Sequence, residues 1–203
     1  AEYDGRRFID AGNVANFGYF DEFSLAAWIR PQGDHGGTII SRMTDADQGD
    51  GYYVQLKSGR IQVNLVKRWL DDAVRVETEQ SLAPDRWHHV MVTYDGSRIA
   101  RGISVYIDGK PVKLTVNLDF INQTFAAAKE PLRIGGGCGP EGRFRGLIDD
   151  VRVYNECLIA DDVQVIATPD SIPRILETTA DQRAPEQAHK LRTYFLASHA
   201  PAN

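Results

Sequence analysis

The sequence predicts an all-β protein, a two-sheet antiparallel jelly-roll sandwich followed by a short helical C-terminal extension. Short runs rich in β-branched and aromatic residues recur at close intervals, separated by Gly, Asp and Asn turns, which is typical of β-sandwiches. Three turns contain Ser-Gly or Asp-Gly pairs, which supply the positive φ of tight hairpins: Lys57-Ser-Gly-Arg60, Tyr94-Asp-Gly-Ser97 and Ile107-Asp-Gly-Lys110. Neighbouring strands are therefore expected to pair antiparallel.

The strands expected on this basis share a short apolar or alternating run bounded by turn residues. In chain order they are Phe23–Ile29, Thr38–Arg42, Tyr52–Lys57, Arg60–Val66, Ala73–Glu77, His88–Tyr94, Ile103–Ile107, Lys113–Val116, Leu132–Ile134 and Phe144–Tyr154. In the last of these strands the hydrophobic alternation changes phase at Asp149-Asp150. Such a shift indicates a β-bulge, or a strand covered on both faces.

The character of the chain changes after residue 158. Residues 159–167 begin with two aspartates that favour the N-terminal end of a helix. Residues 185–198 carry apolar side chains at steps of three and four, which also predicts a helix. Prolines, Pro173 among them, interrupt the stretch between. We therefore divide the chain into a sandwich, residues 1–158, and a helical extension or linker, residues 159–203.

Composition narrows the class of protein. Hydrophobic residues make up 42% of the 203 and charged residues 25%, the balance of a soluble globular protein. No run approaches the roughly 18 apolar residues of a membrane-spanning helix, so membrane insertion is not expected. The net charge of −5 argues against a nucleic-acid partner, because such partners are held mainly by clustered Lys and Arg.

Three segments together carry a family resemblance: Phe144–Leu158, Asp85–Gly96 and Val105–Lys110. In order and spacing they resemble the laminin-G-like branch of the concanavalin A-like lectin/glucanase superfamily, over roughly residues 1–160. The resemblance implies a sandwich of two antiparallel sheets. It says less about activity, because one fold hosts many functions and the site decides between them.

The tail carries a second resemblance. Residues 181–196 are similar to the junction, in large bacterial envelope proteins, where a laminin-G-like domain lies among cytochrome c modules. This similarity implies one module of an exported multidomain protein, located in the periplasm, in the cell envelope or outside the cell. The haem would belong to other modules, because this sequence contains no Cys-x-x-Cys-His motif.

Glycoside hydrolysis is tested first, because the resembled superfamily includes glucanases. Retaining glycosidases place two carboxylates about 5 Å apart, and the glucanase branch carries them on one strand in a Glu-x-Asp-x-x-Glu type pattern. Glu77-Thr-Glu79 lacks the acidic residues that should follow, and Asp149-Asp150 point to opposite faces of a regular strand. The sequence therefore predicts that the protein is not an enzyme.

Calcium is the cofactor that the resemblance implies, since members of that family often carry one. The loop that starts at Asp45 is not an EF-hand, because its twelfth position is Leu56 rather than Glu. Our expected ligands are Asp4 with Asp149 or Asp150, because the first and last strands of such a sandwich commonly lie side by side. The alternative is that these carboxylates accept backbone N–H bonds at turns and bulges.

Trp69 is the candidate contact for a ligand. It lies in the polar connection 66–72, where a large ring has no evident reason for burial, and a sugar ring stacks on such an aromatic. Polar neighbours and residues of a curved sheet complete the expected set: Arg68, Asp71, Asp72, Arg42 and Tyr53. The alternative is a tryptophan that covers a hairpin end beside solvated charges.

These observations predict a non-catalytic recognition module that binds carbohydrate or a neighbouring protein domain through Trp69 and the concave sheet. A structural spacer without a ligand of its own is the main alternative. A glycoside hydrolase of the glucanase branch is the second.

Overall fold

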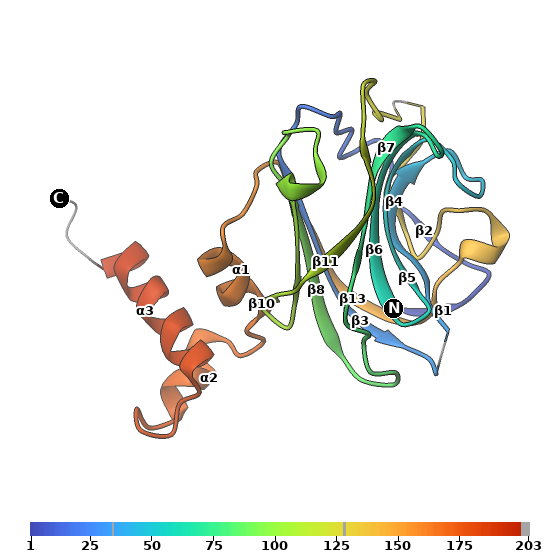
Figure 1. Cartoon of the computed structure of the whole chain (residues 1–203). Helices are drawn as coiled ribbons and strands as arrows, with labels where there is room; N and C mark the ends of the chain where they lie inside the picture. The colour runs from blue at the N-terminus through green and yellow to red at the C-terminus, as the bar shows by residue number, and fades with distance from the viewer. Residues whose placement is uncertain (34, 128, 200–203) are drawn as a thin grey trace.

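The computed structural model, which describes residues 1–33, 35–127 and 129–199, places two sheets face to face with helices at one side (Figure 1). Its strands are β1 (Glu2–Asp4), β2 (Ile9–Asp10), β3 (Phe23–Pro31), β4 (Gly37–Met43), β5 (Gly51–Lys57), β6 (Arg60–Arg68), β7 (Asp72–Thr78), β8 (His88–Tyr94), β9 (Ile103–Ile107), β10 (Lys110–Pro111), β11 (Leu114–Phe120), β12 (Arg133–Ile134) and β13 (Arg145–Tyr154). Its helices are the 3₁₀ turns η1 (Ala100–Gly102) and η2 (Pro140–Gly142), and α1 (Ala160–Ala167), α2 (Ile172–Glu177) and α3 (Pro185–His199).

The two sheets confirm the predicted antiparallel sandwich. One has six strands in the order β1-β13-β3-β8-β9-β10, and the other has seven in the order β11-β7-β6-β5-β4-β12-β2. Alternate side chains of both sheets fill the space between them, and Phe23, Tyr52 and Tyr94 are among the fully buried rings of this core. The remaining alternate positions form two outer faces, and one of them carries the candidate site.

Tight turns fix the register of two hairpins. Ser58 and Gly59 have φ values of 50° and 77°, and Asp108 and Gly109 have 51° and 77°. Positive φ at both central residues matches the twist of the flanking strands, which is why Ser-Gly and Asp-Gly stand there. The third predicted turn is different, because η1 lies between β8 and β9 and lengthens that connection.

The change of phase in β13 is a bulge, as predicted. Asp149 pairs with Trp28 of β3, whereas the next paired residue is Arg152 with Ala26. Asp150, in the bulge, has a φ of 46°. Because of the extra residue, Ile148 before the bulge and Val151 within it both face the core.

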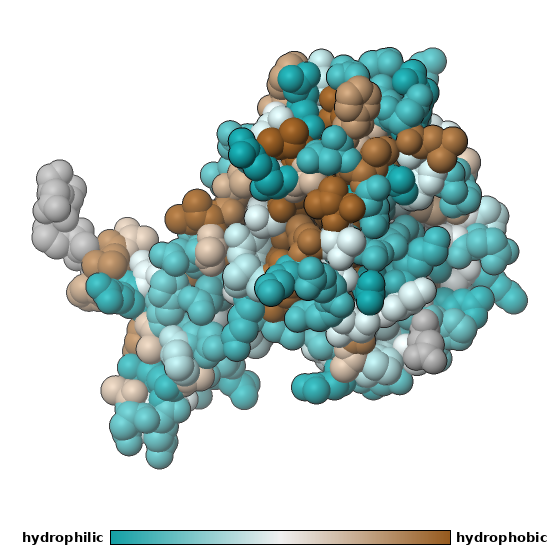
Figure 2. All heavy atoms as spheres, in the orientation of Figure 1, coloured by the Kyte–Doolittle hydropathy of each residue, from teal (hydrophilic) through white to brown (hydrophobic). Residues whose placement is uncertain are grey.

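Strand β11 extends to Phe120, beyond the predicted end at Val116. The prediction stopped early because Asn117 and Asp119 break the apolar pattern of the sequence. It forms one edge of the seven-stranded sheet. Apolar side chains gather over this strand in the middle of the view in Figure 2, and Val116 and Phe120 are 53% and 54% exposed.

The helical extension begins on the outer face of the six-stranded sheet, where Val163 of α1 packs against Met91 and Tyr106. The expectation that prolines only interrupt the extension is wrong for α2. Pro173 lies in the first turn of α2, where no amide donor is needed, and Ser171 caps the helix. None of the described helices is long and apolar enough to cross a membrane.

Candidate ligand-binding face of the seven-stranded sheet

A row of aligned side chains crosses the middle of the outer face of the seven-stranded sheet. Its members are aligned by strand pairing, one from each of five neighbouring strands: Ser41, Tyr53, Asn64, Arg75 and Leu118. At about 4.8 Å between strands, the row is about 19 Å long. We call it the central row.

An apolar cluster borders the central row on one side. Met43, Val66 and Ala73 form it with Cys138 from the loop before η2, and Trp69 packs against it. The connection between β6 and β7 therefore folds back over the sheet. Trp69 covers this apolar cluster and does not stand free in solvent.

The indole of Trp69 stacks on Arg75, whose guanidinium carbon lies 3.9 Å from the ring centroid. Arg75 Nε is fully shielded from solvent, yet it has no hydrogen-bond partner. Burial lowers the pKa of Arg75, and the nearby Tyr53 opposes this shift. An arginine side chain stays protonated even so, so the face carries a partly desolvated positive charge.

Two polar residues of the central row lie deeper. Tyr53 and Asn64 are only 2% and 3% exposed, and the Asn64 Nδ2 donor is without a partner. Burial raises the pKa of Tyr53, so its hydroxyl stays protonated. An unpaired buried amide costs about 1–3 kcal/mol. Such groups are retained where a ligand or a bound water satisfies them.

Hydrogen bonds organise the other side of the central row. Gln55 Nε2 donates to Gln62 Oε1 at 2.7 Å, and Gln62 Nε2 donates to Glu77 Oε2 at 3.0 Å. Arg60 Nη1 donates to Glu77 Oε1 at 3.2 Å. The carboxylate of Glu77 is therefore committed to Arg60 and Gln62, and it leaves the charge of Arg75 unbalanced.

A cavity of about 610 Å³ continues this face toward the loop before β13, with Gln55, Asp47 and Cys138 among its lining residues. Arg143 clamps one wall, because its two Nη atoms donate to both carboxylate oxygens of Asp45 at 3.0 and 2.5 Å. This pairing holds the pKa of Asp45 below its ordinary value. The wall is therefore preformed.

The predicted neighbours of Trp69 have separate roles in the structure. Arg68 and Asp71 pair with each other at 2.9 Å on the solvent side of the connection. Asp72 is buried, and its Oδ1 accepts the backbone N–H groups of Asn122 at 2.7 Å and Gln123 at 3.4 Å. Asp72 therefore anchors the loop after β11 and is not positioned to meet a ligand on this face.

Arg42 does not share a face with Tyr53, contrary to expectation. It pairs with Tyr52, a residue of the core, so its side chain points inward. The fully buried guanidinium donates to Asn13 Oδ1 and to the carbonyl of Val14. Arg42 ties the loop before β3 to the sandwich.

The expected calcium ligands are not brought together. Asp4 pairs in register with Arg145, four residues before Asp149 along β13, which is about 13 Å in an extended strand. Asp4 accepts the backbone N–H groups of Arg6 and Arg7. Calcium binding stays a prediction, and these residues do not fit it.

Asp150 is engaged as well, because it forms two hydrogen bonds with Arg152, at 2.8 and 2.7 Å. This ion pair holds the pKa of Asp150 below its ordinary value. Among the residues that the structure describes, no group of three His, Cys, Asp or Glu side chains is placed to hold a metal ion.

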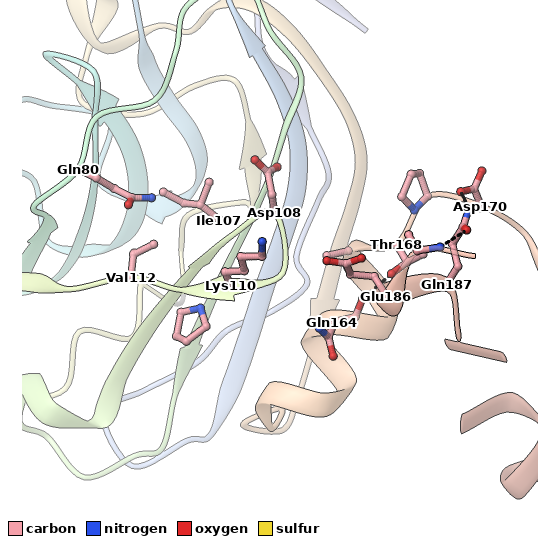
Figure 3. A pocket seen from close by; sticks show the side chains of 14 residues that line it. Gln80, Ile107, Asp108, Lys110, Val112, Gln164, Thr168, Asp170, Glu186 and Gln187 are labelled. Atoms are coloured by element: carbon pink, nitrogen blue, oxygen red, sulfur yellow. Dashed lines mark hydrogen bonds between the residues drawn. The ribbon is translucent and has the colours of Figure 1, made fainter. Parts of the chain in front are cut away.

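A second cavity, of about 720 Å³, lies between the β9–β10 hairpin and the helical extension (Figure 3). Three of its polar lining groups are engaged: Gln187 Nε2 donates to Asp170 at 2.7 Å, and Asp108 is bonded to His88 and to the backbone of His89. We assign this cavity to the contact between the sandwich and the extension.

Sequence reasoning missed Asn64 and Arg75. The two-residue turn at Ser58-Gly59 sets the pairing of β5 with β6, and this pairing places Asn64 opposite Tyr53. The turn sequence could therefore have predicted that Asn64 lies on the same face as Tyr53. Arg75 depends on the register between β6 and β7, which shifts at a bulge between Val66 and Arg68, so no sequence signal marks it.

The two antiparallel sheets define a β-sandwich of the concanavalin A-like class. Residues 4–164 match the family model described as the concanavalin A-like lectin/glucanases superfamily, and the chain belongs to this superfamily. A curated relative is the adhesion G-protein coupled receptor V1 of Danio rerio, 27% identical over 142 residues. The match takes 67% of this chain but spans only 2% of that receptor's length.

Solved structures show the same fold at low sequence identity. The SAP-like pentraxin of Limulus polyphemus has a TM-score of 0.58 and 18% identity, over 82% of this chain and 80% of that one. The CBM40 of Ruminococcus gnavus IT-sialidase has a TM-score of 0.59 and 11% identity, over 80% and 97%. A putative carbohydrate-binding protein of Bacteroides ovatus has 0.55 and 17%, over 79% and 44%.

Proposed function

We propose that this chain is a non-catalytic recognition module that binds a glycan on the outer face of the seven-stranded sheet. One observation carries the proposal: on this face the buried amide donor of Asn64 has no partner, next to a tryptophan held over the sheet. A sugar ring offers both hydroxyls for such a donor and an apolar surface for the indole.

The comparisons support this proposal through the proteins of the same fold. The CBM40 was solved bound to α2,3-sialyllactose, and the protein from Bacteroides ovatus is described as a putative carbohydrate-binding protein. Both are under 25% identical to this chain, so they argue for a class of function and not for a particular ligand.

The carboxylates considered for catalysis favour a binding role. Glu77 is neutralised by Arg60, Glu79 lies beyond the end of β7 at Thr78, and Asp150 is paired with Arg152. A glycosidase needs one carboxyl group free to donate a proton and a second one opposite it. Neither of the pairs considered supplies such a couple.

We further propose that the module works within a larger exported protein. In one curated relative, an adhesion receptor, the matching segment makes up 2% of the full length, which supports a modular role. The more specific context, a bacterial envelope protein with cytochrome c modules, rests on residues 181–196 alone.

A glycan array followed by calorimetric titration tests the proposal. Trp69→Ala is expected to weaken binding of the best glycan by roughly 30-fold, because truncating a central aromatic contact costs about 2 kcal/mol. Leu70→Ala is the matched control, since Leu70 lies in the same connection and is 82% exposed. Silence of the wild type across a broad panel would favour the spacer role, and turnover of a β-glucan would overturn the non-catalytic assignment.

A further inference from the structure

We infer that the glycan bound by this face carries an anionic group, a carboxylate or a sulfate ester, and that Arg75 binds it. This inference rests on the proposed function and specifies its ligand. The observation behind it is the balance of charged side chains on this face, namely those of the central row and of the residues next to it.

Arg75 is exceptional among the arginines of the described chain. Five others are buried or half-buried, and each donates hydrogen bonds: Arg42, Arg60, Arg133, Arg143 and Arg183. Within the residues that the structure describes, Arg75 makes no hydrogen bond and no ion pair. Its stacking on Trp69 is its one specific contact.

The carboxylate best placed to balance Arg75 is already committed. Glu77 stands two residues further along the same face of β7, where Arg60 and Gln62 occupy both of its oxygens at 3.2 and 3.0 Å. The side chains level with Arg75 in the central row are Asn64 and Leu118, which are neutral. The positive charge is therefore partly desolvated, and no acidic side chain of the described residues forms an ion pair with it.

The geometry of Arg75 suits an oxyanion. Only its Nε is fully shielded, so Nη1 and Nη2 reach solvent, and the indole of Trp69 holds the guanidinium plane from one face. A planar guanidinium presents paired donors that match a carboxylate or a sulfate. The buried amide of Asn64 lies beside it for a neighbouring hydroxyl.

Matched saccharide pairs test the inference. Isothermal titration compares sialyllactose with lactose, oligogalacturonate with its methyl ester, and dextran sulfate with dextran. For at least one pair, the wild type is expected to bind the anionic member roughly tenfold to hundredfold more tightly, as a charge-assisted hydrogen bond provides. The pair that responds distinguishes a carboxylate from a sulfate.

Variants assign the preference to this residue. Arg75→Gln is expected to bring the anionic member to the affinity of the neutral one, and Arg75→Lys to retain part of the difference. Arg68→Gln, which removes an exposed charge beside the same tryptophan, is the control and is expected to leave the difference unchanged. Far-UV circular dichroism verifies that each variant is folded.

Failure of this inference is distinguishable from failure of the proposed function. Equal affinity of wild type for both members of every pair, or a preference that survives Arg75→Gln, overturns the anionic assignment. If neutral glycans still bind and Trp69→Ala weakens that binding, the proposed function stands. If no saccharide binds the wild type, both are overturned.

Discussion

A binding residue whose buried donor has no hydrogen-bond partner in the free protein should lower the free energy of unfolding. Arg75 allows this effect to be measured. Arg75→Met keeps most of the aliphatic length and removes the charge and the shielded Nε donor. The structure gives Arg75 no partner within the described chain to lose except the ring of Trp69. The substitution is therefore expected to stabilise the protein while it removes the preference for anionic glycans.

The magnitude follows from two opposing contributions. Relief of one unsatisfied buried donor is worth about 1–3 kcal/mol, and loss of the cation–π contact costs about 0.5–1 kcal/mol. The net expectation is an increase of about 1 kcal/mol in the free energy of unfolding. For a chain of this size, that raises Tm by roughly 2–4 °C.

Urea denaturation measures this change in the free energy of unfolding. An unchanged m value would show that the folded and unfolded states keep their compactness. Arg133→Met is the matched control. Arg133 is 8% exposed and donates to the Met43 carbonyl at 2.7 Å and to Glu130 at 2.6 Å, so its loss is expected to cost about 3 kcal/mol. A destabilisation by Arg75→Met as large as that by Arg133→Met would show that Arg75 has stabilising partners in the free protein.

Three further predictions concern the scaffold around the face. Asp72→Ala is expected to destabilise by about 2–3 kcal/mol, because two backbone donors, including that of Asn122, lose a buried acceptor; an unchanged urea midpoint would contradict this role. Burial lowers the pKa of His89 from 6.5 to about 4, so the unfolded chain takes up a proton first as the pH falls. Stability that is complete above pH 6.5 should therefore decline by about 3 kcal/mol on going down to pH 4. His89→Phe should lose less over this range, and parallel pH curves would exclude the effect. Gly51→Ala is expected to cost roughly 3 kcal/mol, because Gly51 has a φ of +131° and a Cβ there would lie 2.3 Å from the carbonyl oxygen of Arg42; wild-type thermal stability would argue against it.

The sandwich could be predicted because its information is local. Alternation of apolar and polar residues marks individual strands, and the two-residue turns at Ser58-Gly59 and Asp108-Gly109 identify two hairpins directly. Even the bulge in β13 left a trace, since the pattern changes phase at Asp149-Asp150. The polar half of β11 and the helix α2 around Pro173 were missed, because exposed or proline-containing elements lack that periodic signal.

The site was only partly predictable, because it depends on register between strands. The two-residue periodicity of a strand shows which of its own residues share a face. It does not show which residues of a neighbouring strand lie on that same face. Arg42 and Tyr53 are separated by a seven-residue connection, 44–50, and an irregular pairing near Thr38, so their placement on opposite faces was not readable. The position of Arg75 on the outer face could not be predicted, because a bulge between Val66 and Arg68 shifts the register between β6 and β7.

The most direct test of the account is a side-chain NMR titration with the glycan that the array selects. We expect the Nδ2 signal of Asn64, the indole N–H signal of Trp69 and the Nε signal of Arg75 to shift together and to saturate with the calorimetric affinity. Shifts confined to the cavity beside the helical extension, for example at Gln187, with these three signals unmoved, would contradict it.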